Sequence, residues 1–468
     1  MTHDDYRASL DELFRRRRFG IRPGLEVVEA LLAELGHPER KFPAIHITGS
    51  KGKGSTAAMA QAILSAHGLR TGLFTSPHLV SFRERAQVDG RLIPRSAVVE
   101  GIRRVEKAAR EAEAEGRVDR APTFFEATTA LAFDWFAREH VDAAVVEVGL
   151  GGRLDSTNVL DAKVGVLTTV ELEHTDLLGP DLASIAGEKA GILHPNMTGV
   201  VGELPPEARA VVEARASEVG VPLWHAEKEV RVEGRALSEA GQTFTVVVPG
   251  RSFPDLFLPL LGRFQPANAS LAVAAVVRFA HATGFALEAG KVAEGLSRVR
   301  WPGRLERVAK RPELFYDVAH TPESARALAQ SLAEISPLAR PEESTIVFGC
   351  LREKDAGRIL DALSPLASSL IVVPVHSDRS ARPSDLRLTA AGRFPRIVEA
   401  RSAREGLALA RAGTGLDGFT LVTGSDYLIG ELLREPNDPD EPDLSDPGVS
   451  GPEAPSGKPS SVRGGRAG

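Results

Sequence analysis

Apolar and polar positions follow a repeating strand-then-helix order along this chain. Short runs that are almost wholly apolar predict buried strands, and longer stretches with helical periodicity between them predict helices. The strand runs lie at 44–47, 71–75, 143–148 and 164–170, and again at 314–318, 345–348, 370–375 and 419–422. Helices are expected at 4–18, 25–35, 55–64, 97–115, 124–139, 181–192, 265–282 and 288–296. This order predicts an α/β fold in which helices cover mostly parallel sheets.

Breaks in the pattern predict the domain organisation. Residues 226–260 read as strands that alternate and turn, and the helical pattern stops at 299–304 before a fresh strand–helix alternation begins. We therefore expect a first domain at 1–298 and a Rossmann-like second domain at 299–434, with a hinge at 299–304. Residues 435–468 are rich in Pro, Gly, Ser and Asp and bury too little apolar area to offset ordering entropy. They are expected to form a disordered tail.

Composition narrows the class of protein. The chain is 43% hydrophobic and 26% charged, and it has no apolar run long enough for a membrane helix. Of the net charge of −6, the tail carries −4, from seven acidic and three basic residues, so the body is close to neutral and has no positive field for nucleic acid. A polar N-terminal stretch and a single cysteine, Cys350, favour a reducing compartment, the cytoplasm.

A glycine-rich turn joins the strand at 44–47 to the helix that follows. Its residues are Gly49, Ser50, Lys51, Gly52, Lys53, Gly54 and Ser55. Backbone N–H groups at such a strand–turn–helix junction bind phosphate, with a lysine on the terminal phosphates and a hydroxyl on Mg²⁺. The spacing departs from the common GxxxxGK[ST] pattern because Gly54 separates Lys53 from Ser55. The alternative is a helix-capping turn with a solvated lysine.

Polar side chains near three strand ends are candidate metal ligands. Glu147 lies in an otherwise apolar strand, Ser76 follows the strand at 71–75, and His174 follows the strand at 164–170. Ligands of parallel sheets bind beyond the carboxyl ends of the strands, and one carboxylate with hydroxyls and phosphates suits Mg²⁺. The alternative for His174 is a packing or surface residue.

Three further residues have both a chemical and a local interpretation. Lys189 lies in the helix that Asp181 begins, where it would otherwise be a solvated lysine paired with an acid one turn away. Asp317 ends a strand of the second half, and His320 precedes a helix capped by Thr321. Asp317 and His320 are placed to face the first domain, although Asp317 has the alternative of bonding only nearby N–H groups.

These pieces resemble the folylpolyglutamate synthase/dihydrofolate synthase family of the Mur ligase superfamily. The resemblance extends from Pro23 to Gly430 and is carried by many motifs in one order. The matching stretches are IHITGSKGKGS at 45–55, TGLFTSPHL at 71–79, TFFE at 123–126, EVGLGGRLD at 147–155, HT at 174–175, EKAGI at 188–192, Gln265, Asn268, WPGR at 301–304, DVAH at 317–320 and TGS at 423–425. It implies a two-domain fold with an N-terminal P-loop ATPase domain and a C-terminal Rossmann-like domain.

The resemblance also implies a reaction and a role for each matching residue. A carboxylate attacks the γ-phosphate of MgATP to form an acyl phosphate, and the amine of L-glutamate then displaces the phosphate. The nucleotide would be held by the loop 49–55 with Asn268, Arg304 and Asp317, and two Mg²⁺ ions by Ser55, Ser76, Glu147 and His174. The catalytic set would be Lys53, His320 and Lys189, which matches a lysine that reacts with CO₂ to form a carbamate. The remaining contacts would be Thr123, Phe125 and Asp155 around the pterin, and His320 and Ser425 near glutamate.

Departures from the family pattern leave the choice of acceptor open. Ser50-Lys51 replaces Thr-Asn, Val318 a glycine, Thr321 an asparagine, Phe124 a tyrosine and Phe264 a histidine. Since Thr123, Phe125 and Asp155 are retained, we expect activity on both dihydropteroate and reduced folates, in a monomeric enzyme with only small-molecule partners. The alternatives are a Mur-type ligase for another carboxylate and a non-catalytic nucleotide-binding protein.

Overall fold

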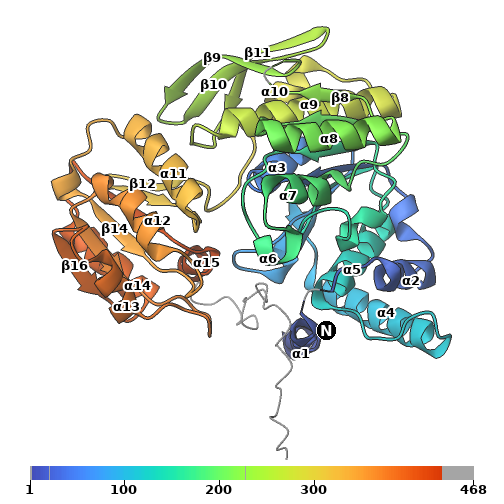
Figure 1. Ribbon diagram of the computed structural model, residues 1–468, viewed down its shortest axis with the longest axis horizontal. Coiled ribbons are helices and arrows are strands. Elements are labelled where there is room, and N and C mark those ends of the chain that lie inside the picture. Colours follow the sequence, from blue (N-terminus) through green and yellow to red (C-terminus); the bar gives the residue numbers. More distant parts are fainter. Residues whose placement is uncertain (1–2, 21, 227, 435–468) are drawn as a thin grey trace, which may run out of the picture.

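The computed structural model describes residues 3–20, 22–226 and 228–434 of the chain. It contains two helix-covered sheets in two lobes, which lie side by side in Figure 1. The expected disordered tail at 435–468 lies outside the described residues. Among those residues, no helix combines the length and the apolar character needed to cross a membrane.

The first lobe is built on an eight-stranded sheet. In spatial order its strands are β4 (Arg91–Leu92), β3 (Ala86–Val88), β2 (Thr71–Phe74), β5 (Ala143–Glu147), β1 (Ala44–Thr48), β6 (Val164–Leu167), β7 (Thr198–Val201) and β8 (Leu223–His225). The six strands from β2 to β8 run parallel, and β3 and β4 add an antiparallel edge that the sequence pattern did not predict. The run at 164–170 is shorter than expected as a strand, because its last three residues form the loop beside the glycine-rich turn.

Side chains of the central strands alternate between two apolar cores. Ile45 and Ile47 of β1 point into one core, whereas Ala44 of the same strand points into the other. The helices of the first lobe are α1 (His3–Arg15), α2 (Glu26–Glu34), α3 (Lys53–Ala66), α4 (Arg95–Ala114), α5 (Phe124–Arg138), α6 (Thr175–Leu178), α7 (Leu182–Ala190), α8 (Pro206–Val219), α9 (Gln265–Thr283) and α10 (Ala289–Ser297). Helices α3, α9 and α10 cover the face of Ile45, and α2, α4, α5, α7 and α8 cover the opposite face.

The residues at 226–260 form the turning strands that the sequence predicts. They are β9 (Arg231–Ser238), β10 (Gly241–Val248) and β11 (Arg251–Leu258), joined as an antiparallel sheet that packs on α9 and α10. This small sheet also contacts the second lobe, since Arg235 of β9 donates to both carboxylate oxygens of Glu334 at 2.6 and 3.0 Å.

The second lobe is a six-stranded sheet with helices on both faces. Its strands, in spatial order, are β12 (Glu306–Lys310), β13 (Glu313–Tyr316), β17 (Phe419–Thr423), β14 (Thr345–Phe348), β15 (Ser369–Val372) and β16 (Arg396–Glu399), and only β12 is antiparallel. Its helices are α11 (Pro322–Ile335), α12 (Ala356–Leu363), α13 (Pro383–Ala390), α14 (Ala403–Gly413) and α15 (Asp426–Leu433). The sequence pattern missed β12 and β16 because these edge strands are partly exposed and lack a continuous apolar run.

The two lobes are joined through the segment at 299–305 and meet again at a loop contact. Asp317, after β13, accepts hydrogen bonds from the N–H of Leu305 at 2.7 Å and of Ala319 at 2.8 Å. On the other side, a Cβ at Gly430 of α15 would lie 2.1 Å from the carbonyl oxygen of Leu79, which follows β2. The second lobe therefore approaches the carboxyl edge of the first sheet closely enough to require glycine.

Candidate functional site

The glycine-rich turn has the geometry that its sequence predicts. Gly52 is the N-cap of α3 with φ +82, and Gly49 has φ +144. A Cβ at Gly49 would lie 1.9 Å from Thr168 Oγ1, and one at Gly52 would lie 2.4 Å from Asn268 Oδ1. Because both the backbone angle and the space exclude a side chain, these two positions require glycine. Helix α3 begins at Lys53, two residues earlier than the expected start at Ser55.

The turn presents a cation and a hydroxyl at the start of α3. Lys53 Nζ donates to the carbonyl oxygen of Gly49 at 2.8 Å. Ser55 Oγ accepts a hydrogen bond from Gln265 Nε2 of α9 at 3.4 Å. The turn is anchored to the loop after β6 by the N–H of Ser50, which donates to Thr169 O at 2.8 Å. An anion that binds at this helix N-terminus meets free N–H groups and the ammonium of Lys53.

A cavity of about 690 Å³ opens from this turn and extends between the two lobes. Of the candidate residues named from the sequence, it is lined by Ser50, Lys51, Gly52, Lys53, Gly54, Ser55, Ser76, Thr123, Phe125, Glu147, Asp155, His174, Asn268, Arg304, Asp317 and His320. Gly49, Lys189 and Ser425 do not line it. Residues from both halves of the chain thus converge on one space.

The four candidate metal ligands line the same cavity, and two of them, Ser76 and Glu147, are joined by a hydrogen bond. Glu147, the last residue of β5, is buried, and its Oε2 accepts a hydrogen bond from the N–H of Ser76 at 3.0 Å. Burial raises the pKa of Glu147, and the positive charge of Lys53 opposes that shift. His174 is the N-cap of α6, and burial lowers its pKa. The described residues contain no group of three or more His, Cys, Asp or Glu side chains arranged as a metal cage.

Lys189 is buried and forms an ion pair that its sequence context did not predict. Its Nζ lies 2.8 Å from Glu173 Oε1, so its partner is 16 residues earlier in the chain rather than one helical turn away. Burial lowers the pKa of Lys189 to about 8, against the opposing charge of Glu173. Burial alone would raise the pKa of Glu173, but Lys189 and Lys53 hold it at about 2. Sequence reasoning missed Glu173, although it directly precedes His174 in the loop that follows β6.

Three candidate residues form one wall of the cavity. Thr123 caps α5, since its Oγ1 accepts from the N–H of Glu126 at 3.3 Å while its own N–H donates to Glu126 Oε2 at 2.7 Å. The ring of Phe125 packs against Phe74 with centroids 5.9 Å apart. Asp155 accepts hydrogen bonds from the N–H of Leu150 at 2.8 Å and from Thr157. This wall combines an aromatic surface with a buried carboxylate.

The candidate nucleotide contacts Asn268, Arg304 and Asp317 line the same cavity. Asn268 of α9 stands against Gly52, and Arg304 Nη1 lies 3.8 Å from Asp426 Oδ1. Burial raises the pKa of Asp317 to about 6, although Arg304 and two N–H donors favour its ionised form. The local interpretation of Asp317 is confirmed, because its carboxylate accepts hydrogen bonds from the N–H groups of Leu305 and Ala319. Its role as a nucleotide contact stays a prediction.

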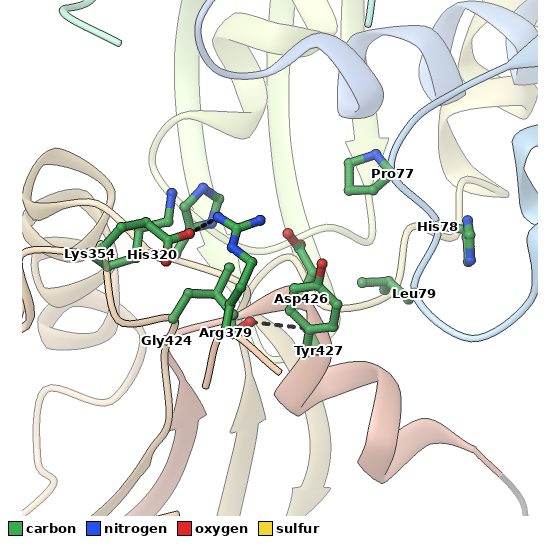
Figure 2. Close-up of a pocket in the computed structure, with 12 residues that line it drawn as sticks. Pro77, His78, Leu79, His320, Lys354, Arg379, Gly424, Asp426 and Tyr427 are labelled. Atoms are coloured by element: carbon green, nitrogen blue, oxygen red, sulfur yellow. Dashed lines mark hydrogen bonds and ion pairs between the residues drawn. The ribbon is translucent and has the colours of Figure 1, made fainter. Parts of the chain in front are cut away.

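A second, smaller cavity of about 140 Å³ adjoins the first and shares His320 with it. In Figure 2, Lys354 and His320 lie on one side of this cavity, and Pro77 and Leu79 lie across it. Ser425 lines it and caps α15 by accepting from the N–H of Tyr427 at 3.2 Å. The sequence analysis did not single out Lys354, a half-buried cation of the second lobe.

One hydrogen bond defines the tautomer of the His320 ring. Its Nδ1 lies 2.9 Å from the carbonyl oxygen of Val318, which can only accept, so Nδ1 carries the proton and Nε2 is the basic nitrogen. Burial lowers the pKa of His320 to about 4, with Asp426 acting in the opposite direction. A neutral imidazole therefore stands where the two cavities meet.

Comparisons with known proteins identify the family. The Mur ligase middle domain model matches residues 47–276, and the model of the Mur ligase glutamate ligase domain matches residues 303–425. The chain is 38% identical over 404 residues to the dihydrofolate synthase/folylpolyglutamate synthase of Mycobacterium tuberculosis, covering 83% of this chain and 82% of that protein. It is 32% identical over 426 residues to the Bacillus subtilis protein of the same name, covering 90% and 96%.

Solved structures agree with these matches. The M. tuberculosis folylpolyglutamate synthase complexed with ADP and AMPPCP superposes with a TM-score of 0.83 at 36% identity, covering 92% of this chain and 99% of that chain. A folylpolyglutamate synthase–AMPPCP–folate complex superposes with a TM-score of 0.77 at 32% identity, covering 90% and 98%. The chain therefore belongs to the folylpolyglutamate synthase/dihydrofolate synthase family of Mur ligases.

Proposed function

We propose that this protein is an ATP-dependent amide ligase that adds L-glutamate to dihydropteroate and to the γ-carboxylate of reduced folates. One observation supports this most strongly: the glycine turn with Lys53, the buried Glu147 and His320 of the other lobe line a single cavity. Relatives that match most of the chain are named for this activity, and one solved relative is a complex with AMPPCP and folate. We propose a monomeric, cytoplasmic enzyme.

The first half of the reaction transfers a phosphoryl group. The loop 49–55, through the N–H groups at the start of α3, and the ammonium of Lys53 hold the phosphates of ATP, with Asn268 beside Gly52 and with Arg304 and Asp317 along the rest of the nucleotide. A carboxylate oxygen of the acceptor attacks the γ-phosphorus, and the bond from that phosphorus to the bridging oxygen of the β-phosphate breaks. ADP is released, and the acceptor becomes an acyl phosphate. Such transfers depend mainly on positioning and charge neutralisation, which this arrangement supplies.

The residues present fit the magnesium that the resemblance implies. Ser55, Ser76, Glu147 and His174 offer two hydroxyls, one carboxylate and one imidazole, and so few protein ligands leave room for phosphate oxygens and water, as Mg²⁺ prefers. When bound there, two Mg²⁺ ions neutralise charge on the phosphates. The carboxylate of Glu147 is already held in place by the N–H of Ser76.

The second half of the reaction forms the amide. The glutamate amine attacks the acyl carbon, the phosphate leaves, and one proton must leave the nitrogen. His320 Nε2 is placed to accept that proton, since it is unprotonated and lies between the cavity of the acceptor and the smaller cavity with Ser425, which we assign to glutamate. Its pKa of about 4 makes it a weak base in this structure. Closure of the domains 1–298 and 299–434 about the hinge at 299–304 would keep water from the acyl phosphate.

Lys189 is proposed to carry a carbamate, formed when its neutral amine bonds to the carbon of CO₂ and loses a proton. Because the pKa of Lys189 is about 8, the fraction of the side chain that is a neutral amine increases as the pH rises from about 7 to about 9. At the lower pH, the ion pair with Glu173 favours the ammonium form. At a fixed pressure of ¹³CO₂, we expect a protein-bound carbamate resonance that grows over this interval and is absent from Lys189→Met. A signal of equal size in that variant would exclude Lys189 as the site.

A phosphate-release assay tests the proposed function. We expect release to require ATP, L-glutamate and either dihydropteroate or a reduced folate, and to stop when any one of them is left out. Thermal shift with MgATP separates the alternatives, because a ligand that binds the folded state raises the melting temperature. Stabilisation by a UDP-muramoyl peptide instead of a pteroate would favour another Mur-type acceptor, and no glutamate-dependent release would favour a non-catalytic protein.

A further inference from the structure

A line of buried side chains connects the central strand β1 to the cavity wall. His46 of β1 is 1% exposed, and its Nε2 lies 2.8 Å from Thr157 Oγ1. Thr157 is wholly buried, and its Oγ1 donates to Asp155 Oδ1 at 2.5 Å. Asp155 lines the large cavity, whereas His46 and Thr157 do not. The hydrogen bonds of the two buried residues therefore link them to the cavity through Asp155.

The protons along this line have a fixed direction when Asp155 is ionised. An ionised carboxylate only accepts, so the single proton of the Thr157 hydroxyl points to Asp155. The oxygen of that hydroxyl then accepts, and His46 Nε2 must be the nitrogen that carries the proton. Burial lowers the pKa of His46 to about 3, so this imidazole is neutral, and beside an ionised Asp155 its one proton is on Nε2. Burial raises the pKa of Asp155, whereas its hydrogen bonds from Thr157 and Leu150 favour the ionised form. His46 thus supplies the donor that keeps the hydroxyl proton directed at Asp155.

The surrounding contacts hold the same loop against β1. Thr48, two residues after His46 and on the same face of the strand, donates from Oγ1 to Gly151 O at 2.6 Å. Asp155 also accepts from the N–H of Leu150 at 2.8 Å and of Thr157 at 3.0 Å. The carboxylate is consequently held in one orientation, and its position depends on the strand that leads into the glycine turn.

We propose that His46 and Thr157 are positioning residues that hold Asp155 as an oriented hydrogen-bond acceptor for the N–H groups of the acceptor's heterocyclic ring. The inference rests on the proposed function, in which Asp155 contacts the pterin. It adds two residues that touch neither substrate nor nucleotide. They are expected to affect the affinity for the pteroate and not the affinity for ATP.

The test is a comparison of Michaelis constants among matched variants. Thr157→Val keeps the shape and removes the hydroxyl, so we expect the KM for dihydropteroate to rise at least about tenfold, while the KM for ATP stays within about twofold. Thr157→Ser restores the hydroxyl and should return the KM close to the wild-type value. His46→Leu should reproduce the effect of Thr157→Val. Thr414→Val, which removes a buried hydroxyl of the second lobe bonded to Thr420, is the control and should change neither constant.

A double-mutant cycle supplies a second readout. If Thr157 acts through Asp155, the variant Thr157→Val/Asp155→Asn should bind dihydropteroate no more weakly than Asp155→Asn alone, as measured by calorimetry with magnesium and a non-hydrolysable ATP analogue. Melting temperatures identify any variant that does not fold, and His46→Leu or Thr157→Val then gives the result alone.

Two kinds of failure can be distinguished. A wild-type protein that neither binds dihydropteroate nor releases phosphate with it would overturn the proposed function. A wild-type protein that is active, with an unchanged dihydropteroate KM in folded Thr157→Val or an equal rise in both Michaelis constants, would overturn the positioning role alone. Additive losses in the double variant would do the same.

Discussion

Replacing Lys53 by methionine is expected to lower kcat by roughly 1,000-fold while the fold is retained, equivalent to about 4 kcal/mol of transition-state stabilisation. Lys53 is the first residue of α3, where its ammonium adds a full charge to the N–H groups of the glycine turn. Methionine keeps the length and the helix propensity of the side chain and removes only the charge and its donors. The lost hydrogen bond to Gly49 O costs about 1 kcal/mol of folding stability. The lost charge also weakens the attraction that opposes burial of the Glu147 and Glu173 carboxylates, so the melting temperature is measured beside kcat to show that the variant is folded.

Phosphate release at saturating ATP, glutamate and dihydropteroate measures this effect. Lys107→Met is the matched control, because Lys107 lies on α4 with a side chain that is 72% exposed, and it does not line the cavity. We expect the control to have wild-type kcat. If Lys53→Met turned over at a rate within about tenfold of the wild type, the glycine turn would not be the phosphate site.

Glu147→Gln is expected to lower kcat at least about 100-fold and to raise the magnesium concentration needed for half-maximal rate at least about tenfold. Glutamine keeps the shape of Glu147, and its amide oxygen can still accept the hydrogen bond from the N–H of Ser76, so the loop after β2 is expected to remain in place. The substitution removes the negative charge. A buried carboxylate beside the glycine turn costs free energy in its ionised form unless a cation compensates its charge. The combined effect on rate and on magnesium demand therefore indicates a metal ligand.

The measurement is a magnesium titration of the initial rate at constant ATP. Glu100→Gln provides the matched control, since Glu100 is an exposed residue of α4 paired with Arg138 and does not line the cavity. An unchanged magnesium dependence in Glu147→Gln, with a normal rate, would remove Glu147 from the metal site.

The parts of this site that could be predicted from sequence are those carried by local signals. The turn at 49–55 is recognisable because glycine, lysine and hydroxyl residues lie between an apolar strand and a helix, and Glu147 stands out as a carboxylate in an apolar run. The strand ends then bring both to the same edge of the sheet. Sheet order and the pairing of distant loops are not encoded in any such short window.

The residues that were missed depend on contacts between distant segments. Glu173 pairs with Lys189 across 16 residues, and His46 reaches Thr157 across 111. Read in its strand, His46 is one polar residue between two isoleucines, and nothing local indicates a partner. The edge strands β12 and β16 were not predicted for a different reason: they are partly exposed, so their sequences mix polar and apolar residues.

The most direct test of the account is a crystal structure of the protein with magnesium and AMPPCP. The account predicts that the β- and γ-phosphates lie on the N–H groups at the start of α3, because those of Ser50 and Lys51 are bonded to Thr169. It also predicts that Lys53 Nζ moves from the carbonyl oxygen of Gly49 to a phosphate oxygen, and that a metal ion is bound at Glu147. A triphosphate bound elsewhere, with Lys53 still on Gly49 and no metal at Glu147, would contradict it.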